Sequence, residues 1–514
     1  MAVQTISNAG GNWNATTTWV SGNVPVSTDT VVTSATSGNL TINVNATIAG
    51  IDFTNGGTVT YTGTITFSTL NLTLSGTLTL ASGMTIAGTS TGGFVVSGTT
   101  TITTNGCVLY NISLSSPPTL ATMTLADTLH VSGLLTMIGG VVNGSSMICS
   151  GSLTMNAIYQ NFSGNSASIT MTGTGTVTGA GSNTIPHNFI VNTSGTITFA
   201  TALALAAGFT YIAGTCVVNS GHTLYISNQS ATFTCTSAVK WYNTSQLNGG
   251  GTITLGGDLW FTNNYVGSGK TFNGAFTIYM GGNVTSTTGN EQIIGTASLV
   301  LNGTGTLNIG SNSASSGLYL ATTINTAGTV TISSVTLNNG GSITYTAGTV
   351  ITTSSTLYLA GAATTLNTSG VTWNNVQVIT STTTVTLNSL LSISGTLTLL
   401  TSTWAGTAGF STSQMTCTTA GATIILHATN TYAVTSVLTL TGTKASRIIF
   451  KSSSTSVNTL FNLTPGATQA VNFVNAQFVD SSGGYTIHNY GGLLTTTINW
   501  DQCGSMFFFF PRAK

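Results

Sequence analysis

Residues 76–80 read Gly76-Thr-Leu-Thr-Leu80, and residues 395–399 repeat the pattern as Gly395-Thr-Leu-Thr-Leu399. Further copies are Gly63-Thr-Ile-Thr-Phe67, Gly195-Thr-Ile-Thr-Phe199, Gly251-Thr-Ile-Thr-Leu255 and Gly328-Thr-Val-Thr-Ile332. Because successive side chains of a strand point to opposite faces, each copy places apolar residues on one face and threonine on the other. Glycine, Asn-Gly and Ser-Gly steps punctuate these runs as turns. The pattern predicts an all-β protein.

Charge is the second unusual feature of the chain. Only 3% of the 514 residues are charged, with seven Lys/Arg and seven Asp/Glu, where a typical globular protein carries about 25%. The zero net charge argues against nucleic-acid binding, and no polybasic cluster is present to bind anionic lipid. Since so few acids and bases are available for chemistry, we expect a protein that is not an enzyme, with no catalytic, cofactor-binding or metal-binding residues.

A longer repeat favours a stacked architecture. Residues 168–177 match residues 298–307 at an offset of 130, and residues 209–215 match residues 343–349 at an offset of 134. Self-similarity at a nearly fixed period is typical of a solenoid. We therefore predict an elongated single-chain parallel β-helix, or β-solenoid, with coils of about 20–25 residues and with N- and C-terminal caps.

The alternative is a series of tandem β-sandwich domains built from antiparallel hairpins. The solenoid is favoured because no obvious linkers divide the chain into units of about 100 residues. Stacking also accounts for the missing charges. Equivalent side chains lie directly above one another in a solenoid, so like charges would repel, whereas neutral threonine and asparagine ladders form hydrogen bonds.

The N-terminal segment differs from the repetitive body. It reads Gly11-Asn-Trp13, then Trp19-Val-Ser-Gly22-Asn-Val-Pro25-Val-Ser-Thr-Asp29-Thr-Val31. This segment resembles the G-x-W…W-x-x-G-x-x-P-x-x-x-D-x-V opening of β-helical repeat proteins in bacterial surface adhesins and phage virion proteins. We expect Trp13 and Trp19 to cover the apolar end of the first coil, since terminal repeats need caps. Pro25 cannot donate to a ladder, and Asp29 can hold a turn by accepting backbone N–H groups.

The C-terminal segment changes composition. Five of the seven cations lie between residues 444 and 514. The segment from Val471 to Trp500 is expected to form the last coils, with Trp500 as a cap residue. The chain finishes with an apolar tail that contains four consecutive phenylalanines, which are costly to expose. They either plug the end of the solenoid or anchor in a partner subunit, which makes them assembly-interface candidates: Phe507, Phe508, Phe509 and Phe510.

These observations divide the chain into four predicted segments. Residues 1–50 form an N-terminal cap or attachment segment, and residues 51–440 form the repetitive solenoid body. Residues 441–502 form a C-terminal end module, and residues 503–514 form the apolar tail.

Candidate catalytic groups are few, but tailspike depolymerases share the β-helical fold and usually need two carboxylates that face each other. Asp480 and Asp501 are separated by about one coil of the predicted solenoid, so these two could stack. The favoured interpretation is that they are turn or cap residues. The Asp127-x-x-His130 pair lacks further ligands and predicts a turn contact. The six cysteines show no C-x-x-C spacing, so we expect small buried or half-buried residues.

We predict a non-enzymatic structural protein that forms a fibre, spike or decoration of a virion, with binding to a host surface as a further function. The alternatives are a bacterial surface adhesin or self-assembling extracellular filament subunit, and a tailspike polysaccharide depolymerase. The expected partners are other virion or filament subunits, further copies of the chain, and a cell-surface glycan or protein receptor. No Sec signal peptide is visible at the start and no transmembrane helix is predicted, so we expect a virion or extracellular-surface location without membrane insertion.

Overall fold

The structure is a computed structural model. It describes residues 2–88, 91–114, 121–155, 168–179, 183–185, 188–201, 203–205, 208–219, 224–225, 232–235, 239–242, 245–247, 251–255, 258–261, 265–267, 270–286, 292–310, 313–381 and 383–503. The chain forms two compact units, Met1–Trp260 and Phe261–Lys514. Each unit is described by itself.

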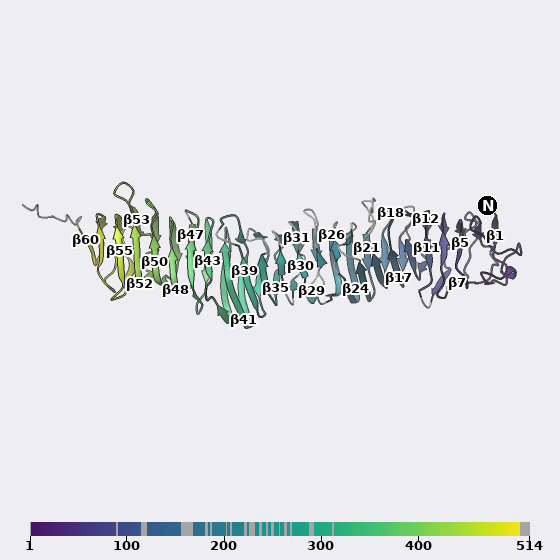
Figure 1. Ribbon diagram of the computed structural model, residues 1–514, viewed down its shortest axis with the longest axis horizontal. Helices are drawn as coiled ribbons and strands as arrows, with labels where there is room; N and C mark the ends of the chain where they lie inside the picture. The colour runs from purple at the N-terminus through teal and green to yellow at the C-terminus, as the bar shows by residue number, and fades with distance from the viewer. Residues whose placement is uncertain are drawn as a thin grey trace, which may run out of the picture. The chain divides into compact units, whose positions relative to one another are not determined.

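Unit 1 is a stack of parallel coils, visible as successive strands in Figure 1. One ladder runs through ten strands of this unit among the described residues. These are β5 (Ala46–Ile48), β8 (Leu72–Leu74), β11 (Phe94–Val96), β14 (Ile112–Leu114), β17 (Leu134–Met137), β20 (Ser152–Met155), β22 (Gly175–Gly179), β24 (Asn188–Phe199), β26 (Gly208–Val218) and β29 (Val239–Tyr242).

Unit 2 repeats this organisation with its own ladder of eleven described strands. These are β35 (Thr277–Met280), β38 (Ser298–Leu301), β41 (Ala321–Leu337), β42 (Ser342–Ile351), β44 (Ala363–Asn367), β47 (Thr383–Leu387), β49 (Ser402–Gly406), β51 (Thr423–Leu426), β53 (Ile448–Ser452), β56 (Val474–Gln477) and β59 (Leu493–Thr495).

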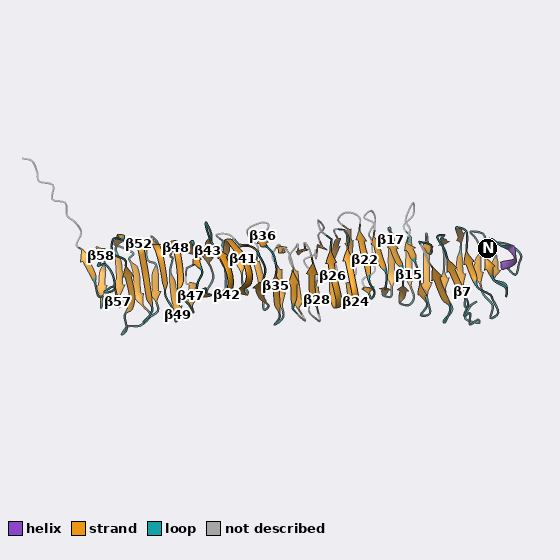
Figure 2. Cartoon of the chain, turned by 90° about the horizontal axis from the view of Figure 1, so that it is seen from below, coloured by secondary structure: helices purple, strands orange, loops and turns teal. Residues whose placement is uncertain are grey.

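Strand pairing identifies the fold as a β-solenoid. Strands that follow each other in these ladders pair in parallel, as Leu72 does with Phe94 in unit 1 and Ile278 with Leu299 in unit 2. The predicted all-β parallel solenoid is therefore confirmed. The tandem β-sandwich alternative is wrong, because sandwiches are built from antiparallel hairpins. Figure 2 shows almost only strands and loops, with one short helix near the N-terminus.

The alternating pattern places apolar side chains inside each coil. In the Gly195 copy, Ile197 and Phe199 are fully buried, and in the Gly395 copy Leu397 is fully buried. The residues between them face outward and stack on their equivalents in the next coil. One outward row of unit 1 consists of directly paired residues, six of which carry a hydroxyl group: Thr47, Thr73, Val95, Ser113, Thr136, Thr154 and Thr178.

Neutral side chains also connect successive coils at the bends. The Asn71 N–H donates to Asn45 Oδ1 at 2.8 Å, and the Leu134 N–H donates to Asn111 Oδ1 at 2.6 Å. In unit 2 the Thr396 N–H donates to Asn375 Oδ1 at 2.9 Å. Backbone donors at bends would otherwise lose partners when the coils stack. An uncharged oxygen can satisfy them without placing like charges above one another, which agrees with the low charge of the chain.

The long repeat in the sequence corresponds to a repeated bend. The Gly195 N–H donates to Thr193 Oγ1 at 2.9 Å in unit 1, and the Gly328 N–H donates to Thr326 Oγ1 at 2.9 Å in unit 2. A Cβ at Gly195 would collide with the Thr174 hydroxyl of the preceding coil. Glycine is therefore required at this bend by the close approach of the coil below it.

The boundaries of the four predicted segments stay predictions, since the two compact units divide the chain at a different position. No helix among the described residues combines the length and the apolar character that crossing a membrane would need.

Candidate functional site

The N-terminal coil is covered along its open edge. Strand β1 (Val3–Thr5) pairs with β3 (Thr30–Val32) on one side. On its other side, Ile6 forms an antiparallel bridge with Trp19, and the Val20 N–H donates to the Thr5 carbonyl at 2.9 Å. The chain thus turns back along the first strand and forms hydrogen bonds with backbone groups of its edge. Without these bonds the edge would be a template for pairing with another chain.

Two tryptophans fill the interior of this coil. Trp13 and Trp19 are both buried and meet edge to face, with ring centroids 5.1 Å apart. The Trp19 indole N–H donates to the Trp13 carbonyl at 2.9 Å. Pro25 is buried outside the strands. This geometry is what a cap over the apolar interior requires, and it leaves neither indole ring available for stacking on a ligand.

Asp29 fixes the N-terminal coil through its buried carboxylate. This group accepts the Ala2 N–H at 3.0 Å, the Val26 N–H at 3.1 Å and the Gln4 side-chain amide at 3.3 Å. The Val26 and Ala2 N–H groups lower the pKa of the Asp29 carboxyl below its ordinary value, against the opposing effect of burial. The carboxylate therefore has a structural role that depends on its charge.

Trp500 lies at the other end of the described chain, in β60 (Trp500–Cys503). Its indole N–H donates to Ser481 Oγ at 2.9 Å, and its ring centroid lies 6.0 Å from that of Phe450. The ring is largely buried and closes the interior of the last coils. The predicted interface residues Phe507, Phe508, Phe509 and Phe510 lie outside the described residues.

Asp480 and Asp501 do not stack. Asp480 pairs with Leu460 and forms a bridge with Ile498, whereas Asp501 pairs with His488. Fewer residues separate paired positions in the last coil than separate the two aspartates. Asp501 therefore lies beside His488, which follows Asp480 in the chain. Asp480 instead accepts the Ser482 N–H at 2.8 Å in its own turn, as the favoured turn interpretation expected. The carboxylate pair suggested for a depolymerase does not form.

Asp127 and His130 also have separate roles. The Asp127 carboxylate accepts the Thr104 N–H at 2.8 Å and the Asn105 N–H at 2.6 Å, both from the preceding coil. His130 lies in β16 (Leu129–Val131), where it pairs with Ile148. The part of the chain that the structure describes contains no group of three His, Cys, Asp or Glu side chains placed to bind a metal ion.

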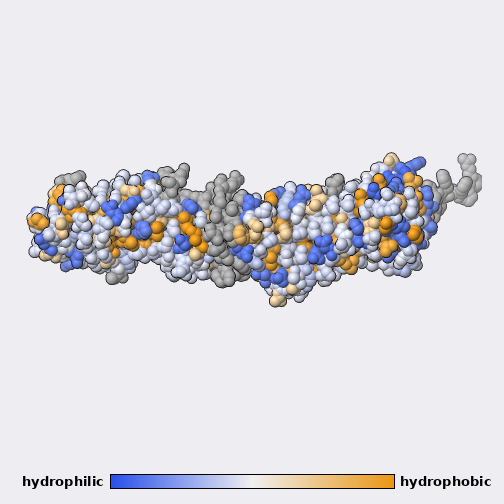
Figure 3. Space-filling model, turned by 180° about the vertical axis from the view of Figure 1, so that it is seen from behind, coloured by the Kyte–Doolittle hydropathy of each residue, from blue (hydrophilic) through white to orange (hydrophobic). Residues whose placement is uncertain are grey.

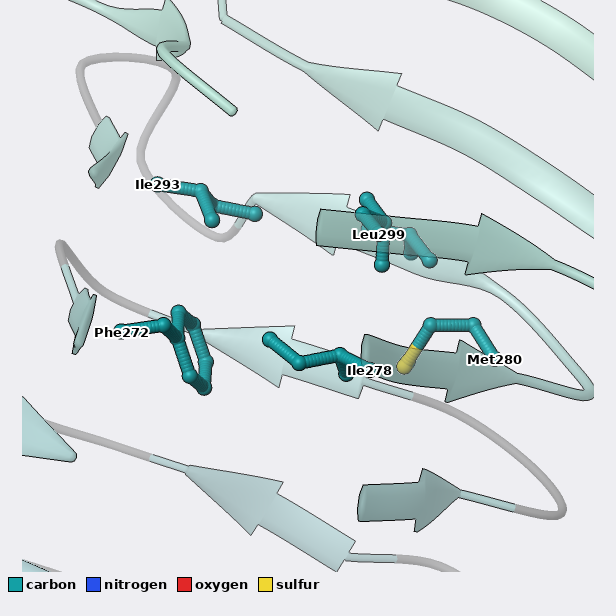
Figure 4. Close-up of a pocket in the computed structure, with 6 residues that line it drawn as sticks. Phe272, Ile278, Met280, Ile293 and Leu299 are labelled. Atoms are coloured by element: carbon teal, nitrogen blue, oxygen red, sulfur yellow. The ribbon is translucent and has the colours of Figure 1, made fainter. Parts of the chain in front are cut away.

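The described cavities are one small interior space and two surface hollows. Figure 4 shows a small space inside unit 2, lined only by apolar side chains such as Phe272, Met280 and Leu299. Its volume of about 10 Å³ is at the lower limit for one water molecule, and it offers no polar partner to hold one. Two shallow hollows on the surface of unit 1, near Cys107 and near Tyr110, measure about 320 and 380 Å³.

The C-terminal coils carry the most distinctive surface of the described chain. Several exposed hydrophobic side chains lie here, at Leu460, Tyr485, Tyr490, Leu493 and Ile498, and the first coil of unit 1 exposes Val3, Val20 and Val26 as well. Figure 3 shows hydrophobic residues gathered over this end of unit 2 together with strongly hydrophilic ones. Tyr490 and Leu493 follow each other closely in the chain at one bend, and neighbouring exposed apolar residues mark interaction sites more often than single ones do.

One corner of these coils combines apolar and reactive side chains. We call it the C-terminal corner and define it by Phe473, His488, Tyr490, Leu493, Asp501 and Cys503. Tyr490 and His488 lie on β58 (Ile487–Tyr490), and Cys503 and Asp501 lie directly beside them on β60. His488 Nδ1 lies 3.4 Å from Asp501 Oδ2 and 3.9 Å from Cys503 Sγ.

The backbone near this corner is unusual. Phe473 has φ of 52° and Phe478 has φ of 55°, although bulky residues rarely adopt positive φ. Both side chains are only half-buried. Earlier turns place asparagine in this conformation, at Asn55 and Asn105. The C-terminal coils use this conformation for small polar residues as well, at Thr496 and Asn499, so the two phenylalanines are the exceptions.

Comparisons with protein-family models, with curated proteins and with solved structures returned no match. The functional assignment therefore depends on the geometry of the chain itself. Sequence reasoning did not find the C-terminal corner. Its residues are separated by irregular spacings, and only the short last coil brings them together.

Proposed function

We propose that this chain is a non-enzymatic structural protein, a β-solenoid component of a fibre, spike or decoration on a virion, which attaches to another subunit through its C-terminal end. The observation that carries this proposal is the difference between the two ends. At the N-terminus the chain folds back over the edge of β1. At the C-terminus the described part of β60 pairs only with β58, beside exposed Tyr490 and Leu493.

A strand edge that pairs on one side only among the described residues, next to apolar side chains, is a surface suited to pairing with another chain. The tail that follows adds four phenylalanines to this end of the sequence. Several bends between coils use neutral side-chain oxygens, as for Asn111 and Leu134. These features support a stacked body of low charge that binds another subunit through its C-terminal end. The resemblance of the N-terminal segment to virion and adhesin proteins supports the same function.

The second candidate is a bacterial surface adhesin or a subunit of an extracellular filament. It uses the same fold, and exposed Tyr490 and Leu493 in the C-terminal coils support it, because contacts between the ends of subunits can propagate. The tailspike depolymerase is not proposed further, since the Asp480 and Asp501 carboxylates have different partners.

Gold-labelled antibodies against the chain, applied to the native source and viewed by electron microscopy, test this proposal. We expect label on projections from virus-like particles. Label on free polymers or on a cell surface would favour the adhesin or filament instead. Label that is dispersed, or release of reducing ends from host polysaccharide by the purified protein, would contradict a structural, non-enzymatic function.

A further inference from the structure

The two surface hollows of unit 1 lie next to each other. Ser132 lines the hollow of about 320 Å³ and Gly133 lines the hollow of about 380 Å³, so a single bend of the chain separates them. Both volumes lie within the range of about 300–1,000 Å³ that is usual for sites of small ligands. The described residues that line the hollows are all uncharged, whereas a site for an ion presents a charge of opposite sign. The lining therefore favours a neutral ligand.

Tyr110 is the aromatic residue of the larger hollow. Its ring lies on the backbone of Gly88 in the preceding coil, where a Cβ at Gly88 would come within 2.0 Å of the Tyr110 Cδ1 atom. The side chain is only half-buried. The hydroxyls of Tyr61 and Tyr345 donate to backbone carbonyls at 2.9 and 2.7 Å, but no described hydrogen bond uses the Tyr110 hydroxyl. The ring is thus held in place while its exposed part and its hydroxyl remain available to a ligand.

Polar groups with fixed positions surround this ring. Asn111 is buried, and its Oδ1 accepts the Leu134 N–H at 2.6 Å. Ser152 Oγ accepts the Thr176 N–H at 3.0 Å, which leaves the hydroxyl hydrogen of Ser152 to donate. The exposed side chain of Thr91 adds a second hydroxyl. An aromatic ring beside hydroxyl groups suits a sugar, because the C–H face of a pyranose packs on the ring and its hydroxyls form hydrogen bonds.

We propose that the two hollows form a binding site for a neutral oligosaccharide, with Tyr110 as the stacking residue. A chain of sugars fits better than a single one, since only the bend at Ser132 and Gly133 separates the hollows and successive sugars can occupy both. Val108, which is 46% exposed, supplies apolar contact area in the smaller hollow. The site lies in unit 1 and adds a binding function to the attachment proposed for the C-terminal end.

The test measures binding of the full chain to an array of immobilised neutral oligosaccharides built from hexoses, deoxyhexoses and N-acetylhexosamines, with sulfated and sialylated oligosaccharides beside them. We expect binding to neutral oligosaccharides that changes little with salt, since no charge takes part. Tyr110→Ala should weaken it by roughly tenfold or more, as truncation of a central aromatic contact does. The matched control is Tyr358→Ala, because Tyr358 is a half-buried, outward-facing tyrosine in β43 (Thr356–Leu359) of unit 2.

A second measurement does not depend on a variant. Hydrogen exchange of the wild-type chain with its best-binding oligosaccharide should slow around Tyr110 and Gly133 and stay unchanged in unit 2. Three results would overturn the proposal: no binding to any neutral oligosaccharide, binding confined to the acidic ones, and protection or affinity that does not involve Tyr110. None of them depends on where the gold label falls in the electron-microscopy test, so the two proposals fail separately.

Discussion

Replacing Trp404 with alanine is expected to lower the free energy of unfolding by about 3–5 kcal/mol, the usual cost of truncating a fully buried large aromatic residue. Trp404 is fully buried in β49 and meets the ring of Phe410 edge to face, with centroids 5.1 Å apart. The Phe410 centroid in turn lies 4.8 Å from that of Tyr432. The substitution removes the first ring of an aromatic series and leaves a cavity that rigid neighbouring coils cannot fill.

The effect should also be local, because each coil of a solenoid contacts mainly its neighbours. Hydrogen exchange should accelerate most in the strands that pair with β49, namely β47 and β51. Thr403→Ala is the matched control, since Thr403 is the adjacent outward-facing residue and should change stability by less than about 0.5–1 kcal/mol. Equal effects of the two substitutions would contradict the inward and outward assignment.

Replacing Asp29 with alanine is expected to release the N-terminal cap. The substitution leaves the Ala2 and Val26 N–H groups and the Gln4 amide without their shared acceptor. The Gln4 amide is the buried donor of the three, and leaving it unpaired costs about 1–3 kcal/mol. The Ala2 and Val26 N–H groups are only part-buried, so the total cost for this coil should be about 1–3 kcal/mol. Hydrogen exchange of β1 and β3 measures it. Asp52→Ala is the matched control, because Asp52 accepts N–H groups only within its own turn, from Thr54 and Gly56.

The pH dependence of the stability of the N-terminal coil provides an independent test of the role of Asp29. The folded-state pKa of Asp29 is lowered, so its contribution to stability is fully present above the ordinary carboxyl pKa. The contribution is lost as the pH falls below that value and through the folded-state pKa. Protection of β1 should therefore decrease at acidic pH in the wild type and change less in Asp29→Asn, which keeps one acceptor oxygen without the charge. An identical pH response in both proteins would contradict this role.

The strands could be predicted from the sequence because the alternation of apolar and polar side chains between two faces is a local property. The Gly195 and Gly328 copies could be assigned an inner and an outer face before any coil was placed. The alternation of Thr with apolar residues therefore predicted which side chains fill the interior.

Contacts between coils were less predictable because loop lengths vary. His488 pairs with Asp501 across a short coil, whereas Phe450 pairs with Ala476 across a coil about twice as long. The length of an average coil was therefore a poor guide to the partner of Asp480. The positive φ of Phe473 was equally hidden, since this conformation is rare for a bulky residue.

Stacking of the outward side chains in register is the reason that we give for the low charge of the chain. Thr136, Thr154 and Thr178 are paired in consecutive coils, so a triple variant T136E/T154E/T178E places three like charges above one another. The matched variant T136E/T154K/T178E alternates the signs at the same positions. Their thermal unfolding at about 0.01 M and about 1 M salt, where screening differs strongly, is the most direct test.

We expect the like-charge variant to be less stable than the alternating variant by about 1 kcal/mol or more at low salt, since directly opposed like charges repel, and we expect high salt to narrow this difference. Equal stability of the two variants at low salt would contradict the stacking explanation.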